Sequence, residues 1–291
     1  MNKVRLFLET VRFEHTVFAL PFAYLGMILA ANWPPVAAGP VAWPTAAQVI
    51  WITVAMAAAR TLGFAVNRYA DRTYDARNPR TAGRPIPSGR MRPRTALIYA
   101  AVALVILIVA AAQINTLTLL LAPGAVALLV GYSYTKRITW LSHWVLGATD
   151  GLAPAGAWVA VRGSIDAPAW LLWLAVTEWI AGFDLIYACQ DTDFDRAERL
   201  HSVPARFGNA AALRLARLNH SLTVATLAVL GIMLALGWAY WAGLVAVAGL
   251  LIYEHHLVSP DDLSRVNIAF FNVNGYIAII VFFATLAGLW V

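Results

Sequence analysis

Long apolar segments alternate with short polar segments along the whole chain of 291 residues. A helix that crosses a bilayer needs about 20 predominantly apolar residues. Segments of about that length occupy residues 15–32, 46–66, 96–113, 117–134, 142–161, 168–189, 220–237, 238–254 and 268–290. The pattern predicts an all-α, multi-pass membrane protein with nine transmembrane helices. No polar segment is long enough to fold separately, so we expect residues 1–291 to form a single domain.

The composition agrees with a lipid environment. Hydrophobic residues make up 61% of the chain and charged residues only 12%, whereas a soluble domain is about 25% charged. The single cysteine, Cys189, excludes an intrachain disulfide, and packing is the ordinary role of a lone buried thiol.

The basic residues predict how the chain is oriented. Of the 21 Lys and Arg residues, 19 lie in alternate polar segments, at residues 1–14, 67–95, 135–141, 190–219 and 255–267. Cytoplasmic loops carry an excess of Lys and Arg. We therefore expect a cell (inner) membrane protein with its N-terminus in the cytoplasm. The same distribution explains the net charge of +6, so no nucleic-acid partner is expected.

A first group of polar oxygens stands at the cytoplasmic end of the second apolar segment. Asn67, Asp71 and Asp75 are spaced i, i+4 and i+8. On a helix each such step drifts by only about 40°, so the three side chains are expected to form one stripe.

A second group stands at the cytoplasmic end of the sixth apolar segment. Asp191 and Asp195 are four residues apart, and Asp184 precedes Asp191 by seven residues, about two helical turns.

Carboxylates so close together repel one another unless a cation neutralises them. Each group could be a solvated helix end whose partners are Arg68, Arg72 or Arg196. Mg²⁺ is the alternative, because it prefers hard oxygen ligands and commonly binds one or two carboxylates together with substrate phosphates. Two groups at corresponding helix ends favour Mg²⁺ that bridges a diphosphate.

Three cationic residues lie on the same predicted side. Lys136 and Arg137 follow the fourth apolar segment, and Arg84 lies in the Gly- and Pro-rich segment 83–89. The first two have an ordinary role as cytoplasmic anchors, and Arg84 has one as a surface-loop residue. Beside two magnesium groups, contact with phosphate becomes the favoured interpretation.

Arg60 lies inside the second apolar segment, seven residues before Asn67 and on the same helical face. A charge at that depth costs at least about 2.5 kcal/mol and needs a partner. The partner is either a structural carboxylate, Glu178 or Asp184, or the carboxylate of an aromatic acceptor. Asp150 and Glu178 also lie within apolar segments, and the sequence does not distinguish a buried pair from a pocket role for them.

Taken in order, these motifs resemble those of the UbiA superfamily of membrane prenyltransferases, in particular its 4-hydroxybenzoate branch. The matching features are Asn67-x-x-x-Asp71-x-x-x-Asp75, Asp191-x-x-x-Asp195, Tyr132-x-x-x-Lys136, the segment Arg84-Pro85-Ile86-Pro87-Ser88-Gly89, and Arg60. The resemblance covers nearly the whole chain, and the ordered set is specific although each motif alone would be weak.

The resemblance implies nine helices around a central cavity beneath a cytoplasmic cap. It implies a transfer of the prenyl group of a polyprenyl diphosphate to a hydroxylated aromatic acid, in quinone (ubiquinone or menaquinone) biosynthesis. The implied Mg²⁺ ligands are Asn67, Asp71, Asp75, Asp191 and Asp195. The implied catalytic residues are Asp71, Asp191, Lys136 and, for the phenol proton, Asp184. The implied substrate-binding residues are Arg60, Asn67, Arg72, Arg84, Tyr132, Arg137 and Tyr187.

The start of the first apolar segment departs from the 4-hydroxybenzoate branch. Glu14-His15 stands where that branch typically has an Asp-Lys-Pro-like stretch. The Glu-His version looks more like relatives assigned to menaquinone synthesis by the futalosine route, which implies 1,4-dihydroxy-6-naphthoate as the acceptor. Both acceptors are aromatic carboxylates, so Arg60 fits either.

Two other functions fit parts of the pattern. A secondary transporter carries polar residues near the bilayer midplane, whereas these carboxylates cluster at helix ends. A superfamily member with another lipid acceptor would share the aspartates, but the residues at Arg60 and Arg84-Pro85 disfavour it. The longer aspartate signature of CDP-alcohol phosphotransferases is absent from the chain.

Overall fold

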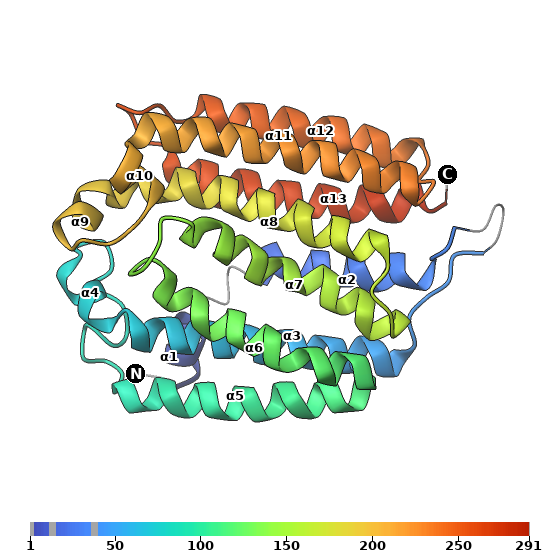
Figure 1. The fold of residues 1–291 in the computed structure, drawn as a ribbon, viewed down its shortest axis with the longest axis horizontal. Coiled ribbons are helices and arrows are strands. Elements are labelled where there is room, and N and C mark those ends of the chain that lie inside the picture. Colours follow the sequence, from blue (N-terminus) through green and yellow to red (C-terminus); the bar gives the residue numbers. More distant parts are fainter. Residues whose placement is uncertain (1–2, 12–15, 36–39, 291) are drawn as a thin grey trace.

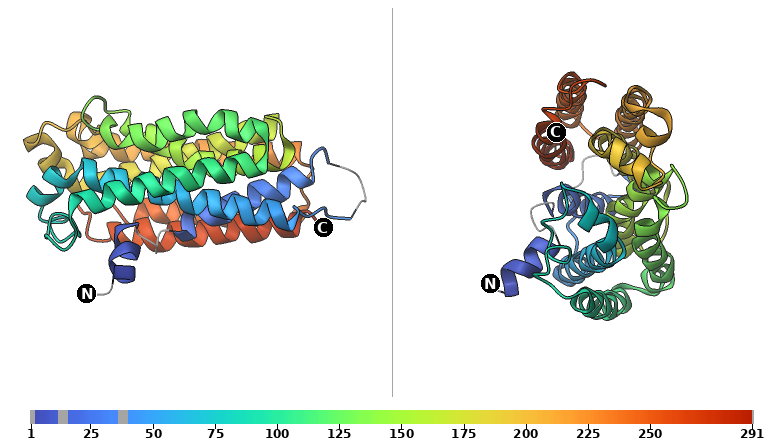
Figure 2. Two further views of the ribbon diagram at one scale, coloured as in Figure 1. Left: turned by 90° about the horizontal axis from the view of Figure 1, so that it is seen from below. Right: turned by 90° about the vertical axis from the view of Figure 1, so that its left-hand side faces the viewer.

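The computed structural model describes residues 3–11, 16–35 and 40–290. Within these ranges every regular element is a helix and there is no strand, which confirms the predicted all-α class. The long helices run side by side along one axis (Figures 1 and 2).

The helices follow the apolar segments along the chain. They are α1 (Lys3–Thr10), α2 (Thr16–Ala31), α3 (Ala46–Ala70), α4 (Arg72–Arg77), α5 (Pro93–Ile114), α6 (Thr116–Thr135), α7 (Ser142–Arg162), α8 (Ala167–Ala188), α9 (Thr192–Ala197), α10 (Val203–Phe207), α11 (Asn209–Met233), α12 (Trp238–His256) and α13 (Asn274–Gly288). A 3₁₀ turn, η2 (Cys189–Asp191), joins α8 to α9, and a π-helix, η3 (Ile268–Val273), leads into α13.

Six of the described helices are long and apolar enough to cross a membrane. They are α3, α5, α6, the run Ala167–Ala197 that contains α8, α11, and the run Ile268–Gly288 that contains α13. The other three predicted spans coincide with α2, α7 and α12, which do not combine the same length and hydropathy. The fold is therefore that of a multi-pass membrane protein, while nine spans remains a prediction.

One predicted boundary is wrong by three turns. The seventh apolar segment was expected to begin at residue 220, but α11 begins at Asn209. Ala212 and Ala216 are buried on one face of the added turns, whereas Arg214 and Arg217 are exposed on the other. The helical period is present in the sequence, but the arginines make those turns too polar to count as part of a span.

Close approach of α7 and α8 fixes the centre of the bundle. A Cβ added at Gly147 on α7 would lie 2.2 Å from the carbonyl oxygen of Thr177 on α8. A Cβ added at Gly151 would lie 2.7 Å from the carbonyl oxygen of Trp173. Small residues allow such contact between apolar helices, where dispersion forces provide much of the attraction.

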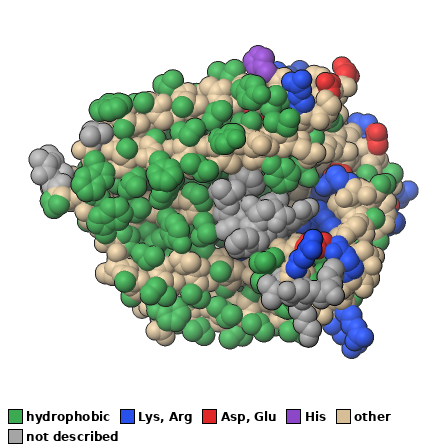
Figure 3. All heavy atoms as spheres, turned by 180° about the vertical axis from the view of Figure 1, so that it is seen from behind, with side chains coloured by type: hydrophobic (Ala, Val, Ile, Leu, Met, Phe, Trp, Pro, Cys, Tyr) green, Lys and Arg blue, Asp and Glu red, His purple; other side chains and the backbone are tan. Residues whose placement is uncertain are grey.

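The outer surface divides into an apolar body and a charged end. Ile98, Val105, Leu120 and Val245 are among the large apolar side chains that remain exposed. Hydrophobic side chains are spread widely over the face in Figure 3, and Lys, Arg, Asp and Glu gather toward one end. That end carries α4, α9 and α10 (Figure 1). An apolar body of this extent suits contact with lipid.

Candidate active site

A cavity of about 750 Å³ lies within the bundle. Its wall is largely apolar and comes mainly from α3, α5, α6, α7 and α8. The polar side chains that line it include Arg60, Asn67, Arg68, Arg84, Tyr132, Asp150, Asp184 and Tyr187. Six of these, all except Arg68 and Asp150, are site residues that the sequence predicted.

Arg60 and Asp150 lie deeper in the bundle than the other charged residues of the cavity wall, which are close to the charged end. Arg60 is on α3, two turns before Asn67, and its guanidinium lies 4.8 Å from the centre of the Phe64 ring. Asp150 is on α7 and lines the same cavity. The cavity therefore combines a long apolar wall with a fixed guanidinium.

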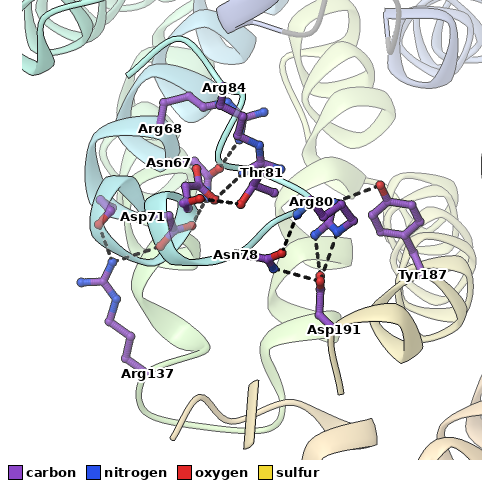
Figure 4. Close-up of polar contacts among 12 residues, drawn as sticks. Asn67, Arg68, Asp71, Asn78, Arg80, Thr81, Arg84, Arg137, Tyr187 and Asp191 are labelled. Carbon is purple, nitrogen blue, oxygen red and sulfur yellow. Dashed lines mark hydrogen bonds and ion pairs between the residues drawn. The ribbon is translucent and has the colours of Figure 1, made fainter. Parts of the chain in front are cut away.

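The first carboxylate group lies where α3 meets α4. α3 ends at Ala70, and Asp71 adopts φ −88° and ψ 4° before α4 begins. Asn67 donates its Nδ2–H to Asp71 Oδ2 at 2.8 Å, and Arg137 Nη2 lies 3.0 Å from Asp71 Oδ1 (Figure 4). Burial raises the pKa of Asp71 above its ordinary value, and the hydrogen bond from Arg137 opposes that rise.

Asp75, the third residue of the first carboxylate group, forms an ion pair with Arg84, whose Nη1 atom lies 2.7 Å from Asp75 Oδ1. The Thr81 hydroxyl donates to the backbone carbonyl of Asp75 at 3.1 Å, which holds the turn after α4. Asp75 is buried, and its Oδ2 atom accepts no hydrogen bond from the described residues. A buried carboxylate oxygen without a donor is a natural ligand position for a cation.

Asp191 joins the second carboxylate group to the segment after α4. Arg80 approaches both carboxylate oxygens, with its Nε atom 3.1 Å from Oδ1 and its Nη2 atom 2.5 Å from Oδ2. Asn78 donates to Oδ1 at 3.0 Å, and Arg80 Nη1 donates to the Tyr187 hydroxyl at 3.2 Å. Figure 4 shows Asn78 and Arg80 reaching across to Asp191 and Tyr187.

Asp195 and Asp184 are held by other partners. Asp195 is almost fully buried, lies 2.8 Å from Lys136 Nζ and accepts the Ser202 hydroxyl at 2.7 Å. Asp184 lies 2.6 Å from Nδ1 of His143. Because His143 Nε2 accepts the Val203 backbone N–H at 3.3 Å, Nδ1 carries the proton and donates to Asp184.

Most of the predicted site residues lie at the charged end of the bundle, but they form several separate contacts there and not a single cluster. Arg72 is directed toward the Tyr69 carbonyl, at 2.6 Å, and stacks over the Tyr69 ring. Sequence reasoning missed Asn78, Arg80 and His143. For Arg80 the only signal was its place among eight basic residues in 67–95. Residues 12–15, which carry the Glu14-His15 pattern, lie outside the described residues.

The donor set fits Mg²⁺ that arrives with a phosphate. Within the described part of the chain, no three Asp, Glu, His or Cys side chains are grouped closely enough to hold a metal by themselves. Mg²⁺ does not require such a cage, since it usually takes one or two carboxylates and completes its shell with water and phosphate oxygens. Asp75 Oδ2 and the neighbouring Asp71 carboxylate offer hard oxygens of that kind.

These features define a class: a helical membrane protein with an apolar cavity that ends beneath paired carboxylates and cations. The chain belongs to the UbiA prenyltransferase family, whose family model matches residues 19–287.

Two curated relatives are named 4-hydroxybenzoate octaprenyltransferase. The one from Escherichia fergusonii is 30% identical over 99% of this chain and 97% of its own length. The one from Citrobacter koseri is 34% identical over 86% of this chain and 87% of its own length.

Two solved structures share the fold. The apo structure of a UbiA homolog from Aeropyrum pernix K1 has a TM-score of 0.83 at 34% identity and covers 94% of this chain and 98% of its own. A UbiA homolog from Archaeoglobus fulgidus, solved with GPP and Mg²⁺, has a TM-score of 0.72 at 18% identity and covers 98% of this chain and 100% of its own.

Proposed function

We propose that this protein transfers a polyprenyl group from a polyprenyl diphosphate to a hydroxylated aromatic acid. The observation that carries the proposal is the cavity, which is apolar along most of its wall and reaches Asn67, Arg84 and Asp184 at its charged end. An apolar wall suits a prenyl chain, and the charged end suits a diphosphate. The names of the curated relatives support an acceptor such as 4-hydroxybenzoate.

In this proposal the two carboxylate groups hold Mg²⁺ through Asn67, Asp71, Asp75, Asp191 and Asp195. Bound Mg²⁺ neutralises the diphosphate and makes it a better leaving group. The A. fulgidus relative was solved with Mg²⁺ and a prenyl diphosphate.

The cations now paired with these carboxylates also contribute. If the carboxylates held Mg²⁺, their partners Arg80, Arg84, Lys136 and Arg137 would have N–H donors available for phosphate oxygens. Such charge-assisted hydrogen bonds are stronger than neutral ones.

The reaction breaks the allylic C–O bond and forms a C–C bond to the aromatic ring. Diphosphate leaves with the bonding electrons, and a ring carbon beside the phenol oxygen attacks the allylic carbon. Tyr132 and Tyr187 line the cavity, where their rings can stabilise the positive charge that develops. Asp184 or Asp191 takes the phenol proton; after the C–C bond forms, the ring carbon loses its hydrogen as a proton and the oxygen regains one, which restores the aromatic phenol. Arg60 binds the carboxylate of the acceptor.

The proposal also includes where the enzyme acts and in which pathway. The enzyme acts in the inner membrane with its charged end toward the cytoplasm, in the biosynthesis of a quinone. The relatives' names favour 4-hydroxybenzoate, whereas the Glu14-His15 pattern favours 1,4-dihydroxy-6-naphthoate.

A transfer assay tests this function and separates the two acceptors. Purified protein in nanodiscs receives geranyl diphosphate and Mg²⁺ with each acceptor in parallel, and products are identified by mass. We expect one geranylated acid, its loss on addition of EDTA, and its loss in Asp191→Asn. Intact diphosphate with both acceptors, and again with farnesyl diphosphate, would overturn the proposal and favour the transporter.

A further inference from the structure

A buried polar network outside the carboxylate groups surrounds the π-helix η3. Asn274 has no exposed surface. Its Nδ2 group lies within hydrogen-bond distance of the Ala269 carbonyl (3.0 Å), the Phe270 carbonyl (3.3 Å) and Glu254 Oε1 (2.8 Å). Its Oδ1 accepts the indole N–H of Trp179 at 2.7 Å. One amide thus holds backbone groups that a π turn leaves out of the regular α-helical pattern.

Glu254 anchors this network from α12. Its carboxylate is fully buried, and Oε2 lies 3.7 Å from Nδ1 of His220 on α11. His220 Nδ1 is also 3.0 Å from Nε2 of His255. Burial of so many polar groups among apolar helices is costly. None of them takes part in the reaction proposed above, so the network needs another role.

The segment that the network holds forms part of the cavity wall. Phe270 and Phe271 of η3 both line the cavity. The Phe270 ring lies 4.2 Å from Tyr187 and 5.1 Å from Phe183, centre to centre, and both rings belong to cavity residues of α8. Tyr187 in turn accepts the hydrogen bond from Arg80. The network and the charged end are therefore linked through one aromatic cluster.

The π turn determines where these rings point. It inserts an extra residue into the helix, and each residue of an α-helix turns the next side chain by about 100°. If η3 relaxed to regular α-helix, Phe270 would turn away from Tyr187 relative to α13. Asn274 favours the π form because its amide donates to the Ala269 and Phe270 carbonyls, and Glu254 holds that amide by accepting from it.

We propose that Asn274 and Glu254 are positioning residues that hold η3 in its π form, so that Phe270 packs against Tyr187 and closes the cavity wall around the allylic end of the prenyl donor. This positioning role rests on the proposed function. A closed wall excludes water from the allylic cation. If it opens, the C–O bond still breaks, but a water oxygen attacks the allylic carbon, a proton goes to solvent, and the donor yields a prenyl alcohol.

The ratio of geraniol to geranylated acceptor therefore tests the proposal, because this ratio does not depend on the amount of folded enzyme. Asn274→Leu, Glu254→Leu and Phe270→Leu are each expected to raise it about two- to tenfold, the range expected for loss of an aromatic pair. Glu254→Gln keeps an oxygen acceptor for Asn274 and should retain the wild-type ratio.

A double variant and a matched control sharpen the test. If Asn274 acts through Phe270, the Asn274→Leu/Phe270→Leu ratio should not exceed that of the larger single variant. Thr285→Val is the control, since Thr285 is buried on α13 and its hydroxyl, among the residues that the structure describes, bonds only to the Val281 carbonyl of the same helix; the ratio should not change. Should Asn274→Leu fail to fold, Trp179→Phe keeps an aromatic ring but removes the indole N–H that Asn274 accepts, and it should raise the ratio.

Hydrogen–deuterium exchange provides a readout without turnover. Asn274→Leu and Glu254→Leu should speed amide exchange in residues 268–273, while Glu254→Gln should not. A wild-type ratio in the folded Leu variants, additive effects in the double variant, or unchanged exchange would each overturn the inference. If the wild-type protein makes no geranylated acid at all, the proposed function fails. The hydrogen–deuterium exchange measurement then still decides whether the network holds η3.

Discussion

Arg60 is the residue whose substitution best separates acceptor binding from donor binding. It lines the cavity beside Asp150, two helical turns from Asn67 and the carboxylate groups. We expect Arg60→Ala to raise the acceptor KM at least about tenfold, since a hydrogen bond between charged groups contributes about 1.5–3 kcal/mol. The donor KM should change by less than about twofold by the same reasoning. Steady-state kinetics with each substrate varied in turn measures both constants.

Arg60→Lys is the matched variant for that experiment. It keeps the charge but loses the planar pair of donors, so its acceptor KM should fall between those of the wild type and Arg60→Ala. A larger rise in the donor KM than in the acceptor KM would assign Arg60 to the diphosphate.

The sequence predicts the acidic residues of the site better than their partners. The spacing of Asn67, Asp71 and Asp75 reflects a local helical period, which any helix expresses. The partners are remote in the chain: Arg137 is 66 residues from Asp71, and Arg80 is 111 residues from Asp191. Such pairs depend on how the helices pack, and no local period encodes that. The site assignment itself remains a prediction.

Among the helices, α7 and α8 approach each other closely at Gly147. A Cβ at Gly147 would overlap the Thr177 carbonyl oxygen, which belongs to backbone and cannot move aside as a flexible side chain can. Gly147→Ala should therefore push α8 away and destabilise the protein by about 1–3 kcal/mol. The midpoint of thermal unfolding in detergent should fall accordingly.

Gly156→Ala is the control on the same helix, because a Cβ there would meet nothing within 4 Å. Its unfolding midpoint should equal or exceed that of the wild type, since alanine favours a helix more than glycine does. Equal midpoints for the two alanine variants would show that α7 and α8 can separate without cost.

Helix positions follow from the apolar pattern, but helix ends and irregular turns do not. Each of the nine predicted segments falls on a helix of the described chain. The start of α11 was missed because its first turns carry arginines on an exposed face. The π turn η3 was also missed, because Asn274, Glu254 and Trp179, whose contacts stabilise it, come from three different helices.

At the scale of the whole molecule, the charged end and the apolar body determine how the protein should lie in a membrane. The end with α4, α9 and α10 carries the carboxylate groups and most of the cations around them (Figures 1 and 3). Basic residues remain on the cytoplasmic side of a membrane. The orientation predicted from the sequence therefore places the charged end in the cytoplasm, where the charged headgroup of the proposed donor is accessible.

Cysteine labelling tests this orientation directly. The only native thiol, Cys189, is buried, so Cys189→Ala supplies a background without accessible thiols. Asp193→Cys places a thiol on α9 at a fully exposed position of the charged end, and Trp43→Cys places one at an exposed position before α3, at the opposite end. In right-side-out vesicles a membrane-impermeant maleimide should label Trp43→Cys and spare Asp193→Cys, and inverted vesicles should give the reverse. Labelling of Asp193→Cys from the outside would place the charged end away from the cytoplasm and would contradict both the predicted topology and a cytoplasmic supply of the prenyl donor.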